Sequence, residues 1–180
     1  MKPWSVLDSQ TLLDRKWLRV KQERVELASG AQIDEFHVIE APSWTAVLAL
    51  RDDGQVVLVE QYRHGLGGTS RELPAGVIDP GETPLQAAQR ELLEETGHAA
   101  DDWRELLTVQ TEPVRHTARA HFFFARGARA VAAPTPMPDE DIRVTLMPVA
   151  GLLQAVEGGA IVHGMHIGPI LLAARRGWLD

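Results

Sequence analysis

Four consecutive apolar residues at positions 56–59 (VVLV) constrain the fold of this chain more than any other feature. An unbroken apolar run in a strand indicates burial on both faces, whereas a strand with one face in water alternates apolar and polar residues. The run lies within QVVLVEQYR (55–63), and RDDG (51–54) joins it to TAVLAL (45–50) as an Asp-Gly hairpin turn. Helices are therefore expected to cover both sides of a sheet, which is an α/β architecture.

Other segments carry weaker patterns of the same kinds. WLRVKQERVEL (17–27) and QIDEFHVI (32–39) alternate in part around a turn-like ASGA, which predicts an N-terminal β-hairpin. The Gly-rich stretch 64–76 and the Pro/Ala-rich stretch 127–141 are expected to be loops. The remaining predictions are strands at 103–110, 119–125 and 142–149, and C-terminal helices near 149–157 and 166–176.

Length and composition predict one domain with one core. The 180 residues are 44% apolar, with no repeat or long linker, so we expect a single domain over 1–180, with an N-terminal β extension over about 1–40 and the core over about 41–180. The net charge of −7 argues against a nucleic-acid or anionic-membrane surface. The chain has no cysteine, no membrane-length apolar run and no signal-peptide pattern at its start, so the expected location is the cytoplasm.

The segment GVIDPGETPLQAAQRELLEETGH (76–98) predicts a helix with both ends defined. Thr83 is a good N-cap, Pro84 suits the first helical position, Gln86 completes a capping box and Gly97 suits the position after the last turn. At 100° per residue, one face is expected to pack on the sheet, and it consists of Leu85, Ala88, Leu92 and Thr96.

Three carboxylates, Glu91, Glu94 and Glu95, lie at the C-terminal end of this helix. The macrodipole is negative there, so each anion costs roughly 0.3–1 kcal/mol, and Glu91 and Glu95 also repel each other as an i,i+4 pair. They converge within an arc of roughly 100°. Such a cluster is typical either of a solvated acidic face or of a hard-cation site for Mg²⁺, Mn²⁺ or Ca²⁺. A bound cation would offset both penalties, and the glycines and the arginine around the cluster favour the cation site.

The segment resembles the Nudix box, whose pattern is G-x5-E-x7-R-E-U-x-E-E-x-G-U with U a bulky apolar residue. The matching residues are Gly76, Glu82, Arg90, Glu91, Leu92, Glu94, Glu95 and Gly97. Only the last position departs, because His98 stands where an aliphatic residue is expected. The resemblance implies a Nudix-like α/β/α sandwich with a mixed sheet. It also implies hydrolysis of a nucleoside diphosphate linked to another group, with Mg²⁺ as the metal and Mn²⁺ able to substitute.

The resemblance also assigns roles to residues. The metal ligands would be Glu91, Glu94, Glu95 and the carbonyl of Ala75, while Glu82 and Arg90 would pair and fix the geometry of the loop and helix. In the related subgroup a glutamate after the box orients the attacking water. PDEDIRV (138–144) offers Asp139, Glu140 and Asp141, of which Glu140 suits the position best, so the catalytic set would be Glu140, Glu94 and Glu95.

The segments EQYRH (60–64) and ELPAGVID (72–79) resemble the ADP-ribose pyrophosphatase and nucleoside diphosphate sugar hydrolase subgroup. This implies cleavage of ADP-ribose to AMP and ribose 5-phosphate by a homodimer joined through N-terminal strands. Trp17 and Phe36 would then sandwich the base. Arg63 would contact phosphate or ribose, and Glu72 would hold this arginine or a substrate hydroxyl.

Two alternatives to ADP-ribose hydrolysis stay open. After Pro113 the subgroup continues with glycine and an acidic residue, whereas this chain has Val114, Arg115 and His116, which leaves room for GDP-mannose or another nucleotide sugar. The second alternative is a Nudix-like module that senses a nucleotide without cleaving it, and the presence of every box glutamate favours the enzyme. His163 and His166 have no cysteine or acidic partner at zinc-site spacing, so no zinc site is expected there.

Overall fold

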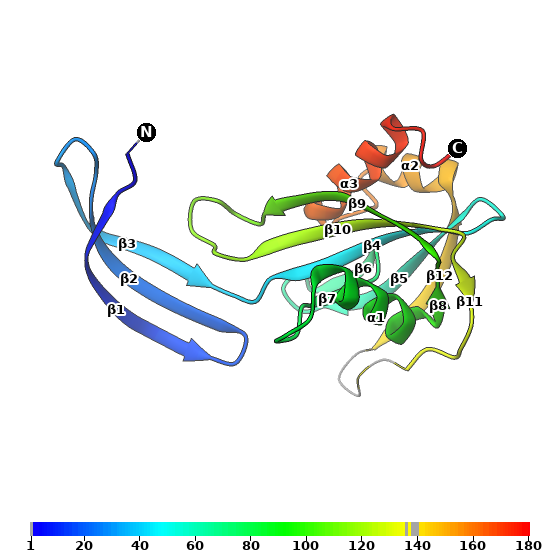
Figure 1. Ribbon diagram of the computed structural model, residues 1–180, viewed down its shortest axis with the longest axis horizontal. Helices are drawn as coiled ribbons and strands as arrows, with labels where there is room; N and C mark the ends of the chain where they lie inside the picture. The colour runs from blue at the N-terminus through cyan, green and yellow to red at the C-terminus, as the bar shows by residue number, and fades with distance from the viewer. Residues whose placement is uncertain (1, 136, 138–140) are drawn as a thin grey trace. The chain divides into compact units, whose positions relative to one another are not determined.

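The computed structural model describes residues 2–135, 137 and 141–180, and they form two compact units (Figure 1). The N-terminal unit comprises Met1–Ser43 and Val109–Arg119, and the core unit comprises Trp44–Thr108 and Ala120–Asp180. Within the described parts of the chain, none of the helices combines the length and the apolar character that a membrane crossing requires.

The N-terminal unit contains a three-stranded antiparallel sheet of β1 (Ser5–Arg15), β2 (Leu18–Glu26) and β3 (Gln32–Glu40), in that order. The predicted hairpin of β2 and β3 is confirmed, and its turn is closed by the Leu27 N–H, which donates to the Ala31 carbonyl over 2.8 Å. Strand β1 was not predicted, because its side chains are exposed along nearly its whole length and carry no alternating pattern.

The core unit contains a mixed sheet in the order β12-β5-β4-β10-β9, and two short strands pair with its inner strands β5 and β4. Strand β10 runs parallel to β4, whereas β5 is antiparallel to β4 and β12 is antiparallel to β5. The bounds are β4 (Trp44–Leu50), β5 (Gln55–Arg63), β9 (Asp102–Gln110), β10 (Arg119–Arg126) and β12 (Ile142–Pro148). Strand β6 (Gly68–Glu72) pairs antiparallel with β5, whereas β7 (Ala75–Val77) pairs antiparallel with β4. A separate antiparallel pair is formed by β8 (His98–Ala99) and β11 (Arg129–Ala130).

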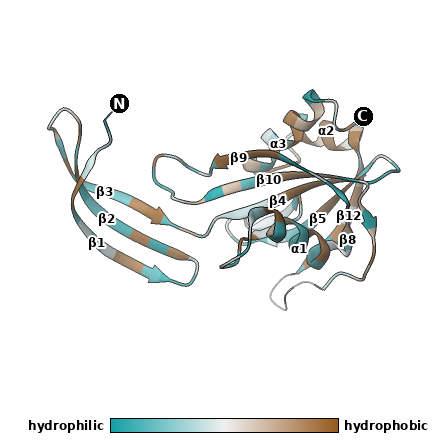
Figure 2. Cartoon of the chain, in the orientation of Figure 1, coloured by the Kyte–Doolittle hydropathy of each residue, from teal (hydrophilic) through white to brown (hydrophobic). Residues whose placement is uncertain are grey.

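Helices cover both faces of this sheet, as the apolar run at 56–59 predicts. Helix α1 (Pro84–Thr96) packs on one face, and α2 (Val149–Glu157) and α3 (Gly164–Arg175) pack on the other (Figure 1). All four residues of the run are completely buried, and the central strands are largely hydrophobic (Figure 2). Phe123 belongs to the cluster beneath α1, whereas its neighbour Phe124 contacts Trp178 with ring centroids 5.4 Å apart. The Nudix-like α/β/α architecture is confirmed.

Three details of the prediction were wrong. The predicted loop 127–141 contains the short strand β11. The stretch 64–76 contains β6 and the start of β7, although its glycines predict a loop. Leu85 is 36% exposed, whereas Ala88 and Leu92 are completely buried. The buried face of α1 is turned away from Leu85 because β7 packs along the helix and buries Glu91 and Glu95 as well.

Both predicted ends of α1 are confirmed. The Thr83 hydroxyl accepts a hydrogen bond from the Gln86 N–H (3.3 Å), and the Gln86 side chain accepts one from the Thr83 N–H (2.8 Å). Gly97 has φ of 68°, in the left-handed region that favours glycine. A Cβ at this position would also collide with the Ala132 carbonyl. These contacts fix where the glutamate-bearing turn of the helix stops.

Candidate functional site

Two glutamates of α1 are enclosed between the helix and β7. Glu91 is 7% exposed and Glu95 is 2% exposed. The Ala75 N–H donates to Glu95 Oε2 over 2.9 Å, and the Glu91 carboxylate packs so closely on Gly76 that an added Cβ would collide with it. The first glycine of the box is therefore required by its contact with the first glutamate of the helix cluster. The carboxylates are positioned by a strand and do not extend freely into solvent.

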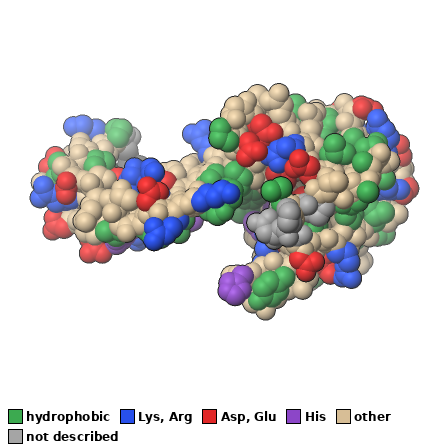
Figure 3. Space-filling model, turned by 90° about the horizontal axis from the view of Figure 1, so that it is seen from below, with side chains coloured by type: hydrophobic (Ala, Val, Ile, Leu, Met, Phe, Trp, Pro, Cys, Tyr) green, Lys and Arg blue, Asp and Glu red, His purple; other side chains and the backbone are tan. Residues whose placement is uncertain are grey.

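Arg90 is the positive centre of this acidic group. Its Nε and Nη2 donate to the two oxygens of Glu82, each over 2.9 Å, and Nη2 also donates to the Val77 carbonyl over 3.0 Å. The hydrogen bonds with Glu82 raise the pKa of Arg90 and lower the pKa of Glu82. The pairing that the family resemblance implies is present, and it ties the loop before α1 to the helix. Acidic and basic side chains likewise lie next to each other on the face seen in Figure 3.

The glutamates of α1 suit a hard divalent cation. Arg90 Nη1 donates to Glu91 Oε1 over 2.7 Å and to Glu94 Oε2 over 3.2 Å, so one oxygen from each carboxylate already approaches a single positive atom. Glu94 is partly exposed, which leaves this side of the cluster accessible. An all-oxygen donor set is the kind that Mg²⁺, Mn²⁺ or Ca²⁺ prefers. The residues present therefore fit the metal that a Nudix box implies.

A cavity of about 560 Å³ adjoins β7 and lies entirely within the core unit. Its volume is in the range of small-molecule sites. The wall includes residues from β4, β5, β6, β7 and the start of α3, among them Trp44, Arg63, Glu72, Ala75, Gly76 and His166. Arg63, Glu72 and Ala75, which the sequence proposes for the site, thus share one cavity, and Gly76 brings that cavity against the Glu91 carboxylate.

Arg63 and Glu72 form a two-pronged ion pair in this wall. Arg63 Nε donates to Glu72 Oε1 over 2.9 Å and Nη2 donates to Oε2 over 2.6 Å. Burial of Glu72 raises its pKa, but the hydrogen bonds from Arg63 oppose this effect and the pKa is lowered overall. Glu72 is therefore ionised near neutral pH, and it holds the Arg63 guanidinium, which is partly exposed, in a fixed orientation at the cavity.

His163 and His166 were missed by the sequence reasoning. Among the described residues, one group of three metal-ligating side chains has ligand atoms all within 4.8 Å of one another, and it consists of Glu72, His163 and His166. The sequence spacing, which gave no reason to expect a zinc site at the two histidines, did not indicate that Glu72 lies beside them. No local spacing could reveal this neighbour, because Glu72 ends β6 and the histidines lie at the start of α3.

His98, the one departure from the box pattern, is buried and hydrogen-bonded. Its Nδ1 lies 2.9 Å from the Thr96 carbonyl, so this nitrogen carries the proton, and its Nε2 lies 3.4 Å from Arg51 Nη1. A hydrogen-bonded ring thus replaces aliphatic packing after the helix, and the departure leaves the glutamate cluster unchanged.

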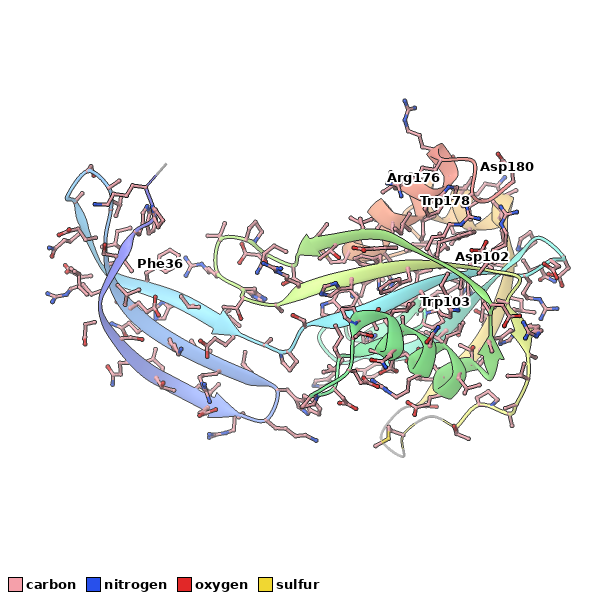
Figure 4. The ribbon with its side chains drawn as sticks, viewed as in Figure 1. Phe36, Asp102, Trp103, Arg176, Trp178 and Asp180 are labelled. Carbon is pink, nitrogen blue, oxygen red and sulfur yellow. The ribbon has the colours of Figure 1, made fainter. Side chains whose placement is uncertain are left out.

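The remaining candidate residues are Trp17, Phe36 and Glu140. Trp17 is 58% exposed, with Lys16 Nζ 4.2 Å from its ring centroid. Phe36, on β3 (Figure 4), makes an edge contact with Trp4 at 5.8 Å and lies 5.7 Å from the Arg115 guanidinium. Both aromatic residues belong to the N-terminal unit, within separate clusters. Glu140 lies outside the described residues.

Residues 41–163 match the NUDIX domain family, so the chain belongs to this family, and it is a Nudix hydrolase. Residues 4–39 match a second family, the nucleoside diphosphate sugar hydrolase N-terminal domain. The two matches together cover the N-terminal sheet and most of the sandwich.

Individual proteins are similar over most of the chain. ADP-ribose pyrophosphatase of Mycobacterium tuberculosis (strain ATCC 25618 / H37Rv) is 31% identical over 170 residues, which cover 93% of this chain and 82% of that protein. ADP-ribose pyrophosphatase of Bacillus subtilis (strain 168) is 35% identical over 127 residues, which cover 71% of this chain and 68% of that protein. A crystal structure of an ADP compounds hydrolase has the same fold, with a TM-score of 0.85 and 20% identity over 99% of this chain and 95% of that one.

Proposed function

We propose that the chain is a metal-dependent pyrophosphohydrolase that cleaves ADP-ribose to AMP and ribose 5-phosphate. The observation that carries this proposal is the contact between the Glu91 carboxylate and Gly76, which brings the box glutamates directly against the wall of a substrate-sized cavity. Similarity to two ADP-ribose pyrophosphatases supports the choice of substrate.

We assign metal binding to Glu91, Glu94, Glu95 and the Ala75 carbonyl, with Mg²⁺ as the ion and Mn²⁺ able to substitute. Bound there, the ion supplies positive charge for the pyrophosphate oxygens and a polarised water for attack on phosphorus. Glu94, Glu95 and Glu140 form the proposed catalytic set, in which Glu140 orients or deprotonates the water.

The other proposed roles concern substrate binding. Arg63 pairs with phosphate or ribose oxygens, because a guanidinium is well suited to phosphate, and Glu72 keeps it in place. Trp17 and Phe36 provide ring faces for adenine. These two assignments are independent of the cavity, which has no residue from the N-terminal unit.

We further propose that the protein is a homodimer joined through its N-terminal strands and works in the cytoplasm, with no nucleic-acid or membrane partner. Val25 is the one buried residue of β1–β3, a sheet whose residues are all described, and a small sheet with so little burial requires cover for stability. The exposed apolar side chains near its β1 edge support this assembly, and they are Val6, Leu7, Leu12, Trp17 and Leu18.

Turnover of ADP-ribose with Mg²⁺, measured as AMP release, tests the proposal. Glu95→Gln keeps an oxygen that accepts from the Ala75 N–H but removes the charge, so kcat is expected to fall at least about 100-fold. Glu157→Gln makes the same chemical change at the exposed C-terminal end of α2 and is expected to leave turnover unchanged. Equal rates for Glu95→Gln and the wild type would remove the catalytic role of Glu95.

GDP-mannose is the second candidate substrate, favoured by Val114, Arg115 and His116 after Pro113. Parallel assays with ADP-ribose, GDP-mannose and UDP-glucose decide between them by the ratio of kcat/KM. Tight binding of a nucleotide sugar without release of any mononucleotide would instead establish the non-catalytic sensing module.

A further inference from the structure

Two stacked histidines line the same cavity. His163 is the N-cap residue of α3 and His166 lies in its first turn. Their rings are 4.0 Å apart between centroids and inclined by only 15°, and their centroids lie 5.8 Å (His163) and 5.9 Å (His166) from the centroid of the Trp44 ring. The proposed roles of the box glutamates, Arg63 and Glu72 leave this pair without a function.

The protonation state of His166 follows from its surroundings. The Leu73 N–H donates to His166 Nδ1 over 3.2 Å, so Nδ1 presents a lone pair and the proton of the neutral ring lies on Nε2. The ring is completely buried, and burial lowers its pKa to about 3. Among the described residues, His166 Nε2 and His163 Nδ1 have no hydrogen-bond partner. His166 is therefore a buried neutral donor that lacks an acceptor, which a folded chain rarely retains without a reason.

This chemistry does not suit a metal, although Glu72 and both histidines lie close together. A metal-bound histidine donates its second N–H, whereas His166 Nδ1 accepts one. The stacked rings have nearly parallel planes, and the Glu72 oxygens are both bound to Arg63. The three ligand atoms lie within 4.8 Å of one another, so an oxygen equidistant from them would lie at most roughly 2.8 Å from each, within reach of a hydrogen bond.

We propose that His163 and His166 are specificity-determining residues that bind, as neutral imidazoles, a hydroxyl of the sugar attached to the diphosphate. This inference rests on the proposed function, which puts the diphosphate at the box glutamates behind β7. The group next to the diphosphate then extends into the cavity. Both unpartnered nitrogens are buried, while the His163 ring as a whole is only partly buried and lines the cavity that the hydroxyl would occupy.

The composition of the wall favours a sugar over a nucleobase in this cavity. An ionised carboxylate, a guanidinium and two imidazoles can each bond a hydroxyl, and Trp44 offers apolar surface to a sugar ring. A base requires flat apolar faces on both sides. The sugar hydroxyl accepts from His166 Nε2–H and from the Nδ1–H of neutral His163, and it donates its own proton to Glu72, which gives both buried nitrogens a partner without moving a charge.

Two variants separate hydrogen bonding from packing. His166→Asn keeps an oxygen that can accept from the Leu73 N–H but has no donor at the place of Nε2, and His163→Phe keeps the stacked ring but loses both nitrogens. His121→Asn is the control, since His121 lies on β10 beside Thr108 and outside this cavity. Each is assayed with ADP-ribose and with the β-methyl ester of ADP, which has the same diphosphate but no sugar beyond it.

For ADP-ribose, kcat/KM is expected to fall about 10- to 100-fold in both variants, mainly through KM, because one desolvated hydrogen bond is lost. For the methyl ester, the change is expected to stay within about 3-fold, and His121→Asn is expected to match the wild type with both compounds. Equal losses with both compounds, or no loss with either, would overturn the inference.

Ribose 5-phosphate binding distinguishes this inference from the proposed function. If the wild type releases no AMP from ADP-ribose, the proposed function fails, and calorimetric titration with ribose 5-phosphate still tests the cavity. Binding weakened at least about 10-fold in both variants supports the inference, and equal or absent binding overturns it. Titration with Co²⁺ alone tests for metal binding. An absorption band that is lost in both histidine variants would show that the histidines bind a metal, and it would overturn the inference of a hydroxyl site.

Discussion

At the residue scale, Gly76 determines whether the site can form, because the Glu91 carboxylate occupies the position where a side chain on residue 76 would begin. Glycine is required at this position by the contact with Glu91 and not by the backbone conformation, because Gly76 does not have a positive φ. A pattern of box residues in the sequence predicts that a glycine stands here, but only the packing of β7 on α1 explains why.

Gly76→Ala is expected to destabilise the fold by about 1–3 kcal/mol, because the new methyl group forces Glu91 or β7 to move. The free energy of unfolding in urea measures this, and titration with Mg²⁺ is expected to show weaker binding. Gly168→Ala is the matched control, since nothing lies within 4 Å of its Cβ position in α3, and it is expected to stabilise by about 0.5–1 kcal/mol. Equal behaviour of the two variants would contradict the explanation.

His166 gives a second prediction at this scale, concerning pH. Its pKa is about 3 in the folded chain against 6.5 ordinarily, so between these values the unfolded chain binds a proton that the folded chain does not. Stability is therefore expected to fall as the pH is lowered from 6.5 toward 3, with a contribution approaching about 1.4 kcal/mol per pH unit.

Urea unfolding between about pH 5 and 8 gives the free energy of unfolding at each pH. The contribution of His166 is the difference between the wild type and His166→Asn in the slope of that free energy against pH. The lowered pKa values of Glu72 and Glu82 do not interfere, because depressed carboxylates lose their stabilising effect only below the ordinary value of 4.5. The same slope in His166→Asn would show that the ring is not held neutral.

At the scale of elements, α1 is defined by contacts local to the chain, which is why its ends could be predicted. Thr83→Ala removes the hydroxyl that accepts from the Gln86 N–H and is expected to lower the free energy of unfolding by about 1 kcal/mol. Thr83→Ser keeps that acceptor and is expected to behave like the wild type. A loss as large in the serine variant would assign the effect to packing of the threonine methyl group.

Elements whose partners are distant in the chain could not be predicted in the same way. The Asp-Gly turn between β4 and β5 has a local signal, whereas β7 is only three residues long and is defined by its pairing with β4. The same limit applied to the site. The box glutamates occupy one helix and could be read from spacing, but the approach of Glu72 to His163 and His166 depends on how β6 and α3 pack. The roles of Glu140, Trp17 and Phe36 stay predictions.

At the scale of the whole molecule, the exposed apolar residues along β1 bear on assembly. Leu12 is 48% exposed on this edge strand, and such a strand readily pairs with a second chain. If the protein is the proposed dimer, light scattering should give twice the monomer mass of 19.8 kDa, and Leu12→Asp should shift the protein toward the monomer. A wild type that remains monomeric at all concentrations would remove the dimer from the proposal.

The two histidines at the start of α3 follow, along the chain, every other part of the cavity wall named above. This order has a consequence for biosynthesis. As the polypeptide leaves the ribosome, β4 to β7 and the glutamate-bearing helix emerge long before His163 and His166. A nascent chain at that stage possesses its acidic cluster but lacks one side of the compartment beside it. The residues of the proposed cation site are therefore synthesised before the residues that complete the proposed sugar site.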